Sequence, residues 1–471
     1  MLFNSYHFLY FFVIVTTFYF LLPHALRWLL LLLSSCYFYM TFVPIYIFIL
    51  FFTIVVDYFA GICIERSQGR SRKAFLVASL AANIGVLAVF KYYNFVNTNL
   101  TVLLSHLGLH NSLPFLAILL PIGLSFHTFQ AMSYTIEVYR GKYKAERNFG
   151  IYSLYVMFYP QLVAGPIERP QNIIHQFREK HRFDYQRVAD GLKLMAWGLF
   201  KKIAIADSLA PIVNTAYENP LQYHGLSFVI ATVFFAFQIF CDFSGYTDMA
   251  RGAAKVMGFS LMTNFNRPYL SRNISEFWSR WHISLSSWFR DYLYIPLGGN
   301  RVSIPRWYFN LFIVFLISGL WHGANWTYLI WGGLNGLYLI FALITQNIRQ
   351  KLVVFTRIDH LPLLYNGIQI ITTFILICAS WVFFRAKTVA DAIYVFKTIW
   401  TDTVGDLFTL IKQHHQTERL TSFSGLAGAV FLILLLELVH GLEGNNSIVD
   451  YVNRKPKYMR WSIYYIFIFR F

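Results

Sequence analysis

The sequence predicts an all-α membrane protein that crosses the bilayer many times, and its composition carries that prediction. Of the 471 residues, 57% are hydrophobic and 13% are charged, with a mean hydropathy of +0.50. Water-soluble globular domains carry about 25% charged residues, so this chain is excluded from that class. Its apolar stretches recur at about the 20-residue length that a spanning helix needs.

The distribution of charge supports the same class. The net charge of +17 is concentrated in loops such as 66–73 and 140–147, which alternate crossing places on one side of the membrane. The opposite loop, 92–112, has no full charge. This pattern follows the positive-inside rule and places the N-terminus outside. Membrane lipid is therefore the expected environment, and no nucleic-acid partner is expected.

The expected membrane segments follow from the apolar stretches. Five spans are predicted near residues 6–22, 26–43, 45–63, 74–90 and 114–136. The next apolar stretch, 149–166, has basic flanks on both sides, which favours a re-entrant hairpin bent at Gly165-Pro166. Further segments are predicted at 189–206, 226–247, 307–347 (two helices), 366–384 and 424–442. We predict about ten to twelve membrane segments in a single domain, residues 1–471.

The C-terminus departs from this pattern. The basic stretch 454–460 is followed only by Trp461 to Phe471. These residues would cover about 16 Å as a helix, roughly half of a 30 Å hydrocarbon core. We therefore predict that the last span is truncated after residue 460 and that Phe471 does not reach the outer face.

His322 is the leading catalytic candidate. Between Trp307 and Asn347 it is the only side chain that titrates near neutral pH, close to a hinge expected near Gly319, Gly323 and Asn325. Ionisable groups at membrane depth are costly and usually functional. The alternative is a core histidine satisfied by a backbone carbonyl. The helix-breaking backbone near Gly323, with Asn325, could supply oxyanion donors.

A second candidate region is the arginine-rich patch, residues 264–306, which contains six arginines, no lysine and only two acids. Arginine binds phosphate bidentately and stacks on aromatic rings, so the patch suits an anionic ligand. An interfacial amphipathic helix explains the composition equally well. The candidate donor-binding residues are Arg267, Arg272, Arg280, Arg290, Arg301 and Trp281. His282 lies in the middle of the patch, and helical spacing predicts that Trp278, Trp281, His282 and Leu285 share one face.

These motifs together resemble a known family. The segments SEFWSRWHISLSSWFRDYLYIPLGGNR and SGLWHGANWTYLIWGGLNG, with PIGLSFHTFQAMSYTIEVYRG, FYPQLVAGPIERP and CDFSGYTDMARGAAKVMGF, are similar to the membrane-bound O-acyltransferase (MBOAT) family. The resemblance is to its bacterial alginate and peptidoglycan O-acetyltransferase branch and covers about Phe3 to Phe384. It implies a ring of helices around a central tunnel. It also implies that His322 is the catalytic histidine and His282 the second active-site histidine.

The implied activity is transfer of acetyl from cytoplasmic acetyl-CoA, across a bacterial plasma (inner) membrane, to an extracytoplasmic polysaccharide such as alginate or peptidoglycan. A neutral imidazole can take the acceptor's hydroxyl proton. His282 could orient the acceptor, polarise the thioester or assist proton transfer. The resemblance also implies an extracytoplasmic partner of the SGNH-hydrolase type. Acetyl-CoA would be a substrate, and no bound cofactor is expected.

A different class of function stays open on the sequence. A non-enzymatic carrier or flippase of a glycan or acylated intermediate would also use buried polar groups and re-entrant segments. The four cysteines are far apart and form no metal-binding motif, so no metal is expected. His127 is interpreted as structural. Asp242 and Asp248 are interpreted as packing or tunnel-lining residues.

Overall fold

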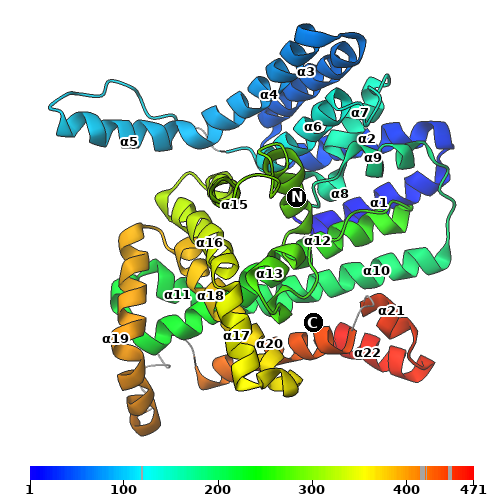
Figure 1. The fold of residues 1–471 in the computed structure, drawn as a ribbon. Coiled ribbons are helices and arrows are strands. Elements are labelled where there is room, and N and C mark those ends of the chain that lie inside the picture. The colour runs from blue at the N-terminus through cyan, green and yellow to red at the C-terminus, as the bar shows by residue number, and fades with distance from the viewer. Residues whose placement is uncertain (118–119, 414–419, 421, 444–447, 471) are drawn as a thin grey trace. The chain divides into compact units, whose positions relative to one another are not determined.

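The computed structural model describes residues 1–117, 120–413, 420, 422–443 and 448–470, and every regular element among them is helical (Figure 1). The all-α prediction is therefore confirmed. The chain forms two compact units, one of residues 1–196 and 246–263, the other of 197–245 and 264–471. It passes between them within helices α10 (Tyr185–Phe200) and α12 (Gly225–Met257), and again after residue 263. A single domain stays a prediction.

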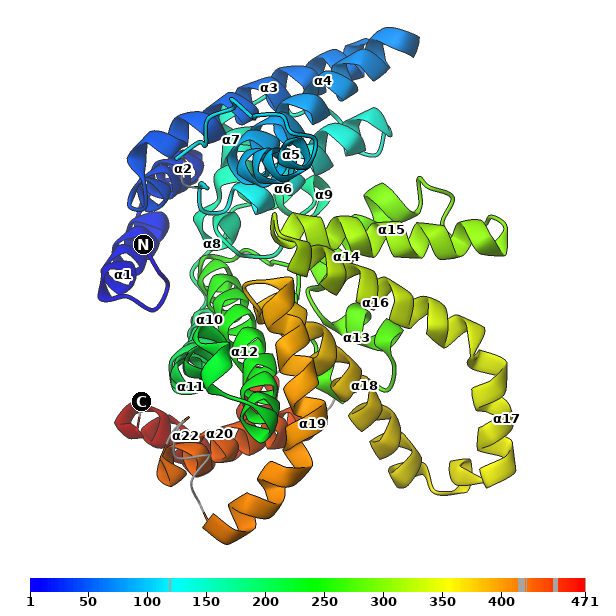
Figure 2. The same cartoon turned by 90° about the vertical axis from the view of Figure 1, so that its left-hand side faces the viewer.

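The first unit is built on the packing of α3, α4 and α6, and of α2 on α7. The elements are α1 (Tyr6–Leu21), α2 (His24–Met40), η1 (Pro44–Tyr46), α3 (Ile47–Arg66), α4 (Gly69–Leu87), η2 (Ala88–Tyr92), α5 (Tyr93–His106), α6 (Leu124–Tyr139), α7 (Phe149–Met157), α8 (Tyr159–Leu162), α9 (Pro170–Ile173) and η3 (His175–Arg178). Helices α3 and α4 lie side by side in both ribbon views (Figures 1 and 2). The core is rich in tyrosine, with the rings of Tyr134 and Tyr152 only 4.5 Å apart.

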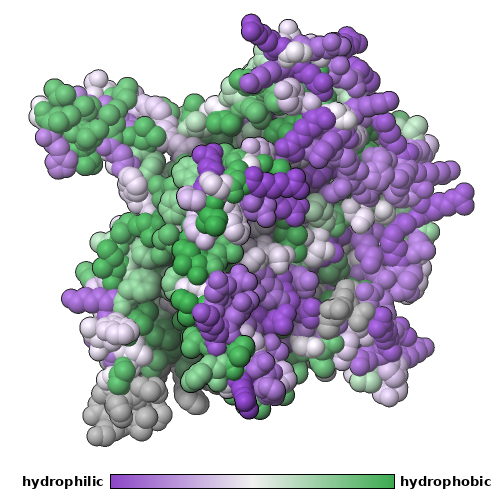
Figure 3. Space-filling model, in the orientation of Figure 1, coloured by the Kyte–Doolittle hydropathy of each residue, from purple (hydrophilic) through white to green (hydrophobic). Residues whose placement is uncertain are grey.

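Two predicted boundaries in this unit are wrong. The expected loop 92–112 is helical over most of its length as α5, which continues the helical run Gly69–His106. The Asn97 amide donates to the backbone oxygens of Leu113 and Pro114 (both 3.2 Å) and so holds the chain that follows the helix. The helix expected from residue 114 begins at Leu124. Gly123, with φ 77°, precedes it, and a left-handed residue cannot continue a right-handed helix. Hydrophobic side chains cover much of the surface of α5 (Figure 3).

The second unit contains the tightly packed pair α15 and α16, with α16 also packed on α18. Its elements are η4 (Lys201–Ala206), α11 (Asp207–Glu218), η5 (Pro220–Gln222), η6 (Pro268–Leu270), α13 (Ile274–Arg280), α14 (Ile283–Phe289), η7 (Arg290–Tyr294), α15 (Ile304–His322), α16 (Trp326–Ile344), α17 (Gln346–Thr356), η8 (Ile358–His360), α18 (Pro362–Arg385), α19 (Val389–Gln413), α20 (Phe423–Glu443), α21 (Ile448–Asn453) and α22 (Lys457–Arg470). The sequence did not predict α17 or α19. Phe471 lies outside the described residues, so the truncation stays a prediction.

Seven described helices are long and apolar enough to cross a membrane, which confirms a multi-pass membrane protein. They are Pro44–Arg66, Gly69–His106, Gly225–Met257, Ile304–His322, Trp326–Ile344, Pro362–Arg385 and Ser424–Glu443. Residues 149–166 instead form the short helices α7 and α8, separated at Phe158. Neither reaches the 30 Å of a hydrocarbon core. The break between them precedes the predicted bend at Gly165-Pro166, and the re-entrant hairpin itself stays a prediction.

Candidate active site

His322 is the last residue of α15, at the turn between two apolar helices. The hinge predicted there is confirmed, because α16 begins at Trp326. Asn325 caps α16 by accepting the Thr327 amide (3.0 Å), and its own amide group donates to the backbone oxygen of Lys387 (3.1 Å). The side chain of Asn325 therefore anchors the helix start. Its role as an oxyanion donor stays a prediction.

Two glycines let α15 and α16 cross closely just before His322. A Cβ at Gly319 would lie 3.2 Å from the Cα of Gly332 and 2.2 Å from the backbone oxygen of Tyr328. A Cβ at Gly332 would lie 2.3 Å from the backbone oxygen of Phe315. Small residues are typical where membrane helices approach each other most closely. This crossing sets the distance between His322 and the residues of α16.

Aromatic rings surround the His322 imidazole. Its ring centroid lies 4.8 Å from Trp321, 5.0 Å from Trp331 and 5.4 Å from Phe384. Trp331 in turn stacks on Trp381, at 5.8 Å and an interplanar angle of 16°. His322 itself is partly buried. The imidazole is thus packed in an apolar wall, while the residue as a whole is only partly buried.

His282 lies between α13 and α14 and is 2% exposed. Its backbone is left-handed, with φ 44° and ψ 55°. The prediction that Trp278, Trp281, His282 and Leu285 share one helical face is therefore wrong, because the helix ends at Arg280 and restarts at Ile283. The imidazole meets the ring of Phe243 edge to face at 4.7 Å.

The two histidines border one site within the second unit. The Trp321 indole lies 6.3 Å from the His282 ring and 4.8 Å from the His322 ring. Burial, and secondarily the positive charge of a protonated His322, lower the pKa of His282 well below its ordinary value. His282 is therefore neutral at pH 7 and can accept or donate a hydrogen bond.

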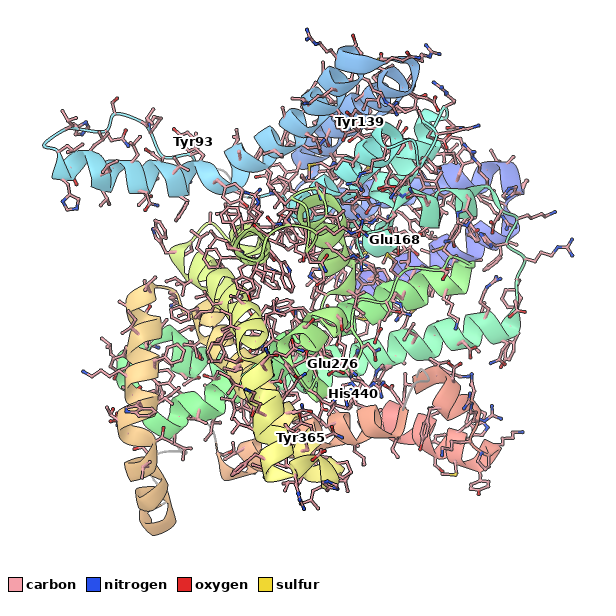
Figure 4. All side chains as sticks on the ribbon, viewed as in Figure 1. Tyr93, Tyr139, Glu168, Glu276, Tyr365 and His440 are labelled. Atoms are coloured by element: carbon pink, nitrogen blue, oxygen red, sulfur yellow. The ribbon has the colours of Figure 1, made fainter. Side chains whose placement is uncertain are left out.

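Two of the predicted arginines share one carboxylate. Arg280 Nη2 lies 2.6 Å from Glu276 Oε1, and Arg272 Nε lies 3.6 Å from Glu276 Oε2. Glu276, labelled in Figure 4, comes from α13. The group keeps one net positive charge. The sequence identified the arginines but gave Glu276 no role, although its i, i+4 spacing to both was a usable signal.

The other predicted arginines do not join this group. Arg290 is exposed and pairs with its neighbour Asp291 (2.9 Å). Arg267 has a left-handed backbone and donates to a backbone oxygen of α20 (3.4 Å). Arg301 is exposed. Binding of an acyl donor by any of these residues stays a prediction.

A cavity of about 170 Å³ lies among α13, α14, η7, α15 and α16. Trp278, Ser286, Arg290 and Ser318 are among its lining residues. Its volume resembles that of the engineered cavity of about 150 Å³ that binds benzene, so it has room for a small organic group. Ser286 lies one turn after His282, and Ser318 one turn before His322. The cavity therefore borders α14, which begins directly after His282, and α15, which ends at His322.

Trp281 packs inside the second unit. It is 4% exposed, and its ring lies 5.1 Å from Trp381 and 5.5 Å from Phe277. These contacts join the turn at His282 to the aromatic wall at His322 through Trp381. Its proposed contact with the acyl donor stays a prediction.

Other polar candidates have local partners. His127 Nε2 lies 2.5 Å from Thr53 Oγ1, inside the first unit. Asp242 pairs with Lys202 (2.5 Å) and Asp248 with Arg251 (3.3 Å). Among the described residues, no group of three or more His, Cys, Asp or Glu side chains could hold a metal ion.

Sequence reasoning missed two buried acids in the first unit. Asp57 accepts hydrogen bonds from Ser79 (2.6 Å) and Asn83 (2.9 Å), on the neighbouring helix α4. Glu168, labelled in Figure 4, accepts from the backbone amide of Met262 (2.5 Å). Burial raises the pKa of Glu168 to about 7. Asp57 was recognisable as a lone acid within an apolar stretch.

Comparisons with known proteins agree with the motifs. The family model of the membrane-bound O-acyltransferase family matches residues 146–384. The probable alginate O-acetylase of Pseudomonas aeruginosa is 38% identical over 409 residues, covering 85% of this chain and 75% of its own. That of Azotobacter vinelandii is 39% identical over 393 residues, covering 82% and 75%. The peptidoglycan O-acetyltransferase of Helicobacter pylori is 35% identical over 395 residues, covering 78% and 72%.

Proposed function

Because the chain belongs to the membrane-bound O-acyltransferase family and is thus a multi-pass membrane enzyme, we propose that it transfers acetyl from acetyl-CoA for the O-acetylation of an extracytoplasmic polysaccharide. The observation that carries the site assignment is the pair of histidines bordering Trp321. The names of the relatives support acetyl as the acyl group and a surface polysaccharide as the acceptor. Family membership favours a transferase over a carrier. The bacterial plasma membrane is the proposed location.

His322 is proposed as the general base. It is the more accessible histidine of the pair, so an acceptor hydroxyl can reach it. As the hydroxyl oxygen attacks the thioester carbonyl, His322 takes the hydroxyl proton; the new C–O bond forms and the C–S bond breaks. The proton then passes to the departing thiolate, which yields free CoA. The neutral His282 would orient the acceptor, polarise the carbonyl or assist this proton transfer.

The arginine-rich patch is proposed to receive the phosphates of acetyl-CoA. The Arg272–Glu276–Arg280 group retains one positive charge, and guanidinium groups bind phosphate bidentately. Transfer onward to the polymer is assigned to an extracytoplasmic partner of the SGNH-hydrolase type. Loss of polymer acetylation, with CoA release intact, in cells lacking that partner would support this division of labour.

The test is release of free CoA from acetyl-CoA by the purified protein, with water taking the acetyl group in place of the acceptor hydroxyl, followed with a thiol reagent. We expect His322→Ala to reduce the rate by about 10²- to 10⁴-fold, and His282→Ala to reduce it by the same amount or less. His360→Ala, which changes an exposed histidine in η8 of the same unit, is the matched control and should keep the wild-type rate. Wild-type turnover in a correctly inserted His322→Ala protein would refute the assignment.

A further inference from the structure

The helix that begins directly after His282 is capped by a residue from another segment. Asn264 accepts two hydrogen bonds there, from the Ile283 amide to its backbone oxygen (2.9 Å) and from the Ser284 amide to Oδ1 (3.1 Å). His282 occupies the N-cap position of α14, yet its side chain makes no cap bond. A side-chain oxygen at that position normally accepts these first amides. Asn264 therefore performs the capping that His282 does not.

This arrangement supports a costly backbone conformation. His282 is left-handed, with φ 44° and ψ 55°, which is unfavourable for a residue with a Cβ. Such residues persist where the surrounding structure fixes them. Here the Asn266 amide also donates to the Arg280 oxygen (2.9 Å). The segment 264–266 thus binds the chain on both sides of the turn at His282.

We infer that Asn264 is a positioning residue for His282. By accepting both amides it holds the turn, so that the imidazole is released from capping and stays against Phe243 at the site. Asn264 is 1% exposed, which keeps water from replacing it as the acceptor. This inference rests on the proposed function only in giving His282 a part in the reaction.

The activity test compares three variants of the full-length protein. Asn264→Ala should lower kcat for CoA release about 10- to 100-fold with KM changed less than about twofold, since a displaced catalytic group costs rate more than binding. Asn264→Asp keeps the acceptor and, at a helix N-terminus that favours negative charge, should restore most of kcat. Asn148→Ala is the matched control. Asn148 caps α7 by accepting the Ile151 amide (3.1 Å), is exposed and lies outside the arginine-rich patch, so its kcat should equal that of the wild type.

Hydrogen–deuterium exchange of the peptide covering 283–287 tests the cap without activity. Exchange should be about 2- to 30-fold faster in Asn264→Ala, the range expected for a lost cap, and close to wild type in Asn264→Asp and Asn148→Ala. If the wild type releases no CoA, the proposed function fails, while the exchange data still decide the cap.

Two outcomes would overturn the inference. One is wild-type exchange and kcat in Asn264→Ala. The other is a folded Asn264→Asp protein with kcat as low as that of Asn264→Ala, which would assign the effect to the amide donor instead of the cap. If Asn264→Ala does not fold, Asn264→Asp decides the question. It must fold, slow the exchange of residues 283–287 as the wild type does and release CoA; if it does not, the inference is rejected.

Discussion

The glycine crossing before His322 permits a test with two adjacent residues. Gly332 and Gly333 are both buried on α16. A Cβ at Gly332 would lie 2.3 Å from the backbone oxygen of Phe315, whereas a Cβ at Gly333 would make an ordinary contact of 3.6 Å with the Phe312 ring. Backbone cannot rotate away as a side chain can. Gly332→Ala must therefore push α16 from α15, and Gly333→Ala need not.

The two variants should differ in stability and in rate because only Gly332→Ala overpacks the crossing of α15 and α16. Both gain up to about 1 kcal/mol of helix propensity from Gly to Ala, so this term cancels between them. Overpacking should cost Gly332→Ala about 1 to 3 kcal/mol, or roughly 2 to 12 °C in melting temperature. A shift of about 1 Å in a supporting element can also cost about 10²-fold in rate. We expect such a loss because Trp331, next to Gly332, contacts His322.

Thermal unfolding of both purified variants in one detergent, together with CoA release, measures these quantities. Gly333→Ala should match or exceed the wild type in melting temperature and keep its kcat. Equal melting temperatures and equal kcat for the two variants would show that the crossing does not control the placement of His322.

The double change Arg272→Gln and Arg280→Gln should raise the KM for acetyl-CoA about 3- to 10-fold, an effect expected for lost charged contacts at partly exposed sites. Arg349→Gln, at an exposed arginine on α17 outside the arginine-rich patch, should leave this KM unchanged; a wild-type KM in the double variant would exclude phosphate binding by Arg272 and Arg280. Burial raises the pKa of Glu168 from 4.5 to about 7, so stability should fall as pH rises from 4.5 to 7. Glu168→Gln should recover on the order of 3 kcal/mol at pH 8, measured as a higher melting temperature; an unchanged pH dependence would contradict this.

Several features of this protein were determined by the sequence itself. Membrane spanning was predictable from composition and from the length of the apolar stretches, because both are properties of single segments of the chain. The hinge at His322 was predictable because Gly319, Gly323 and Asn325 interrupt one long apolar run. The family was recognisable because its motifs are continuous in the chain.

Tertiary structure decided the features that depend on distant partners. Periodicity placed His282 on a helical face, yet the helix breaks there and Asn264, from another segment, caps the next helix, α14. Asn97 on α5 likewise holds the chain that follows this helix, a contact that local periodicity does not report. Local patterns report the preference of a segment for helix. They do not report which distant carbonyl or amide will satisfy its ends, and at His282 that distant partner fixes the backbone of the site.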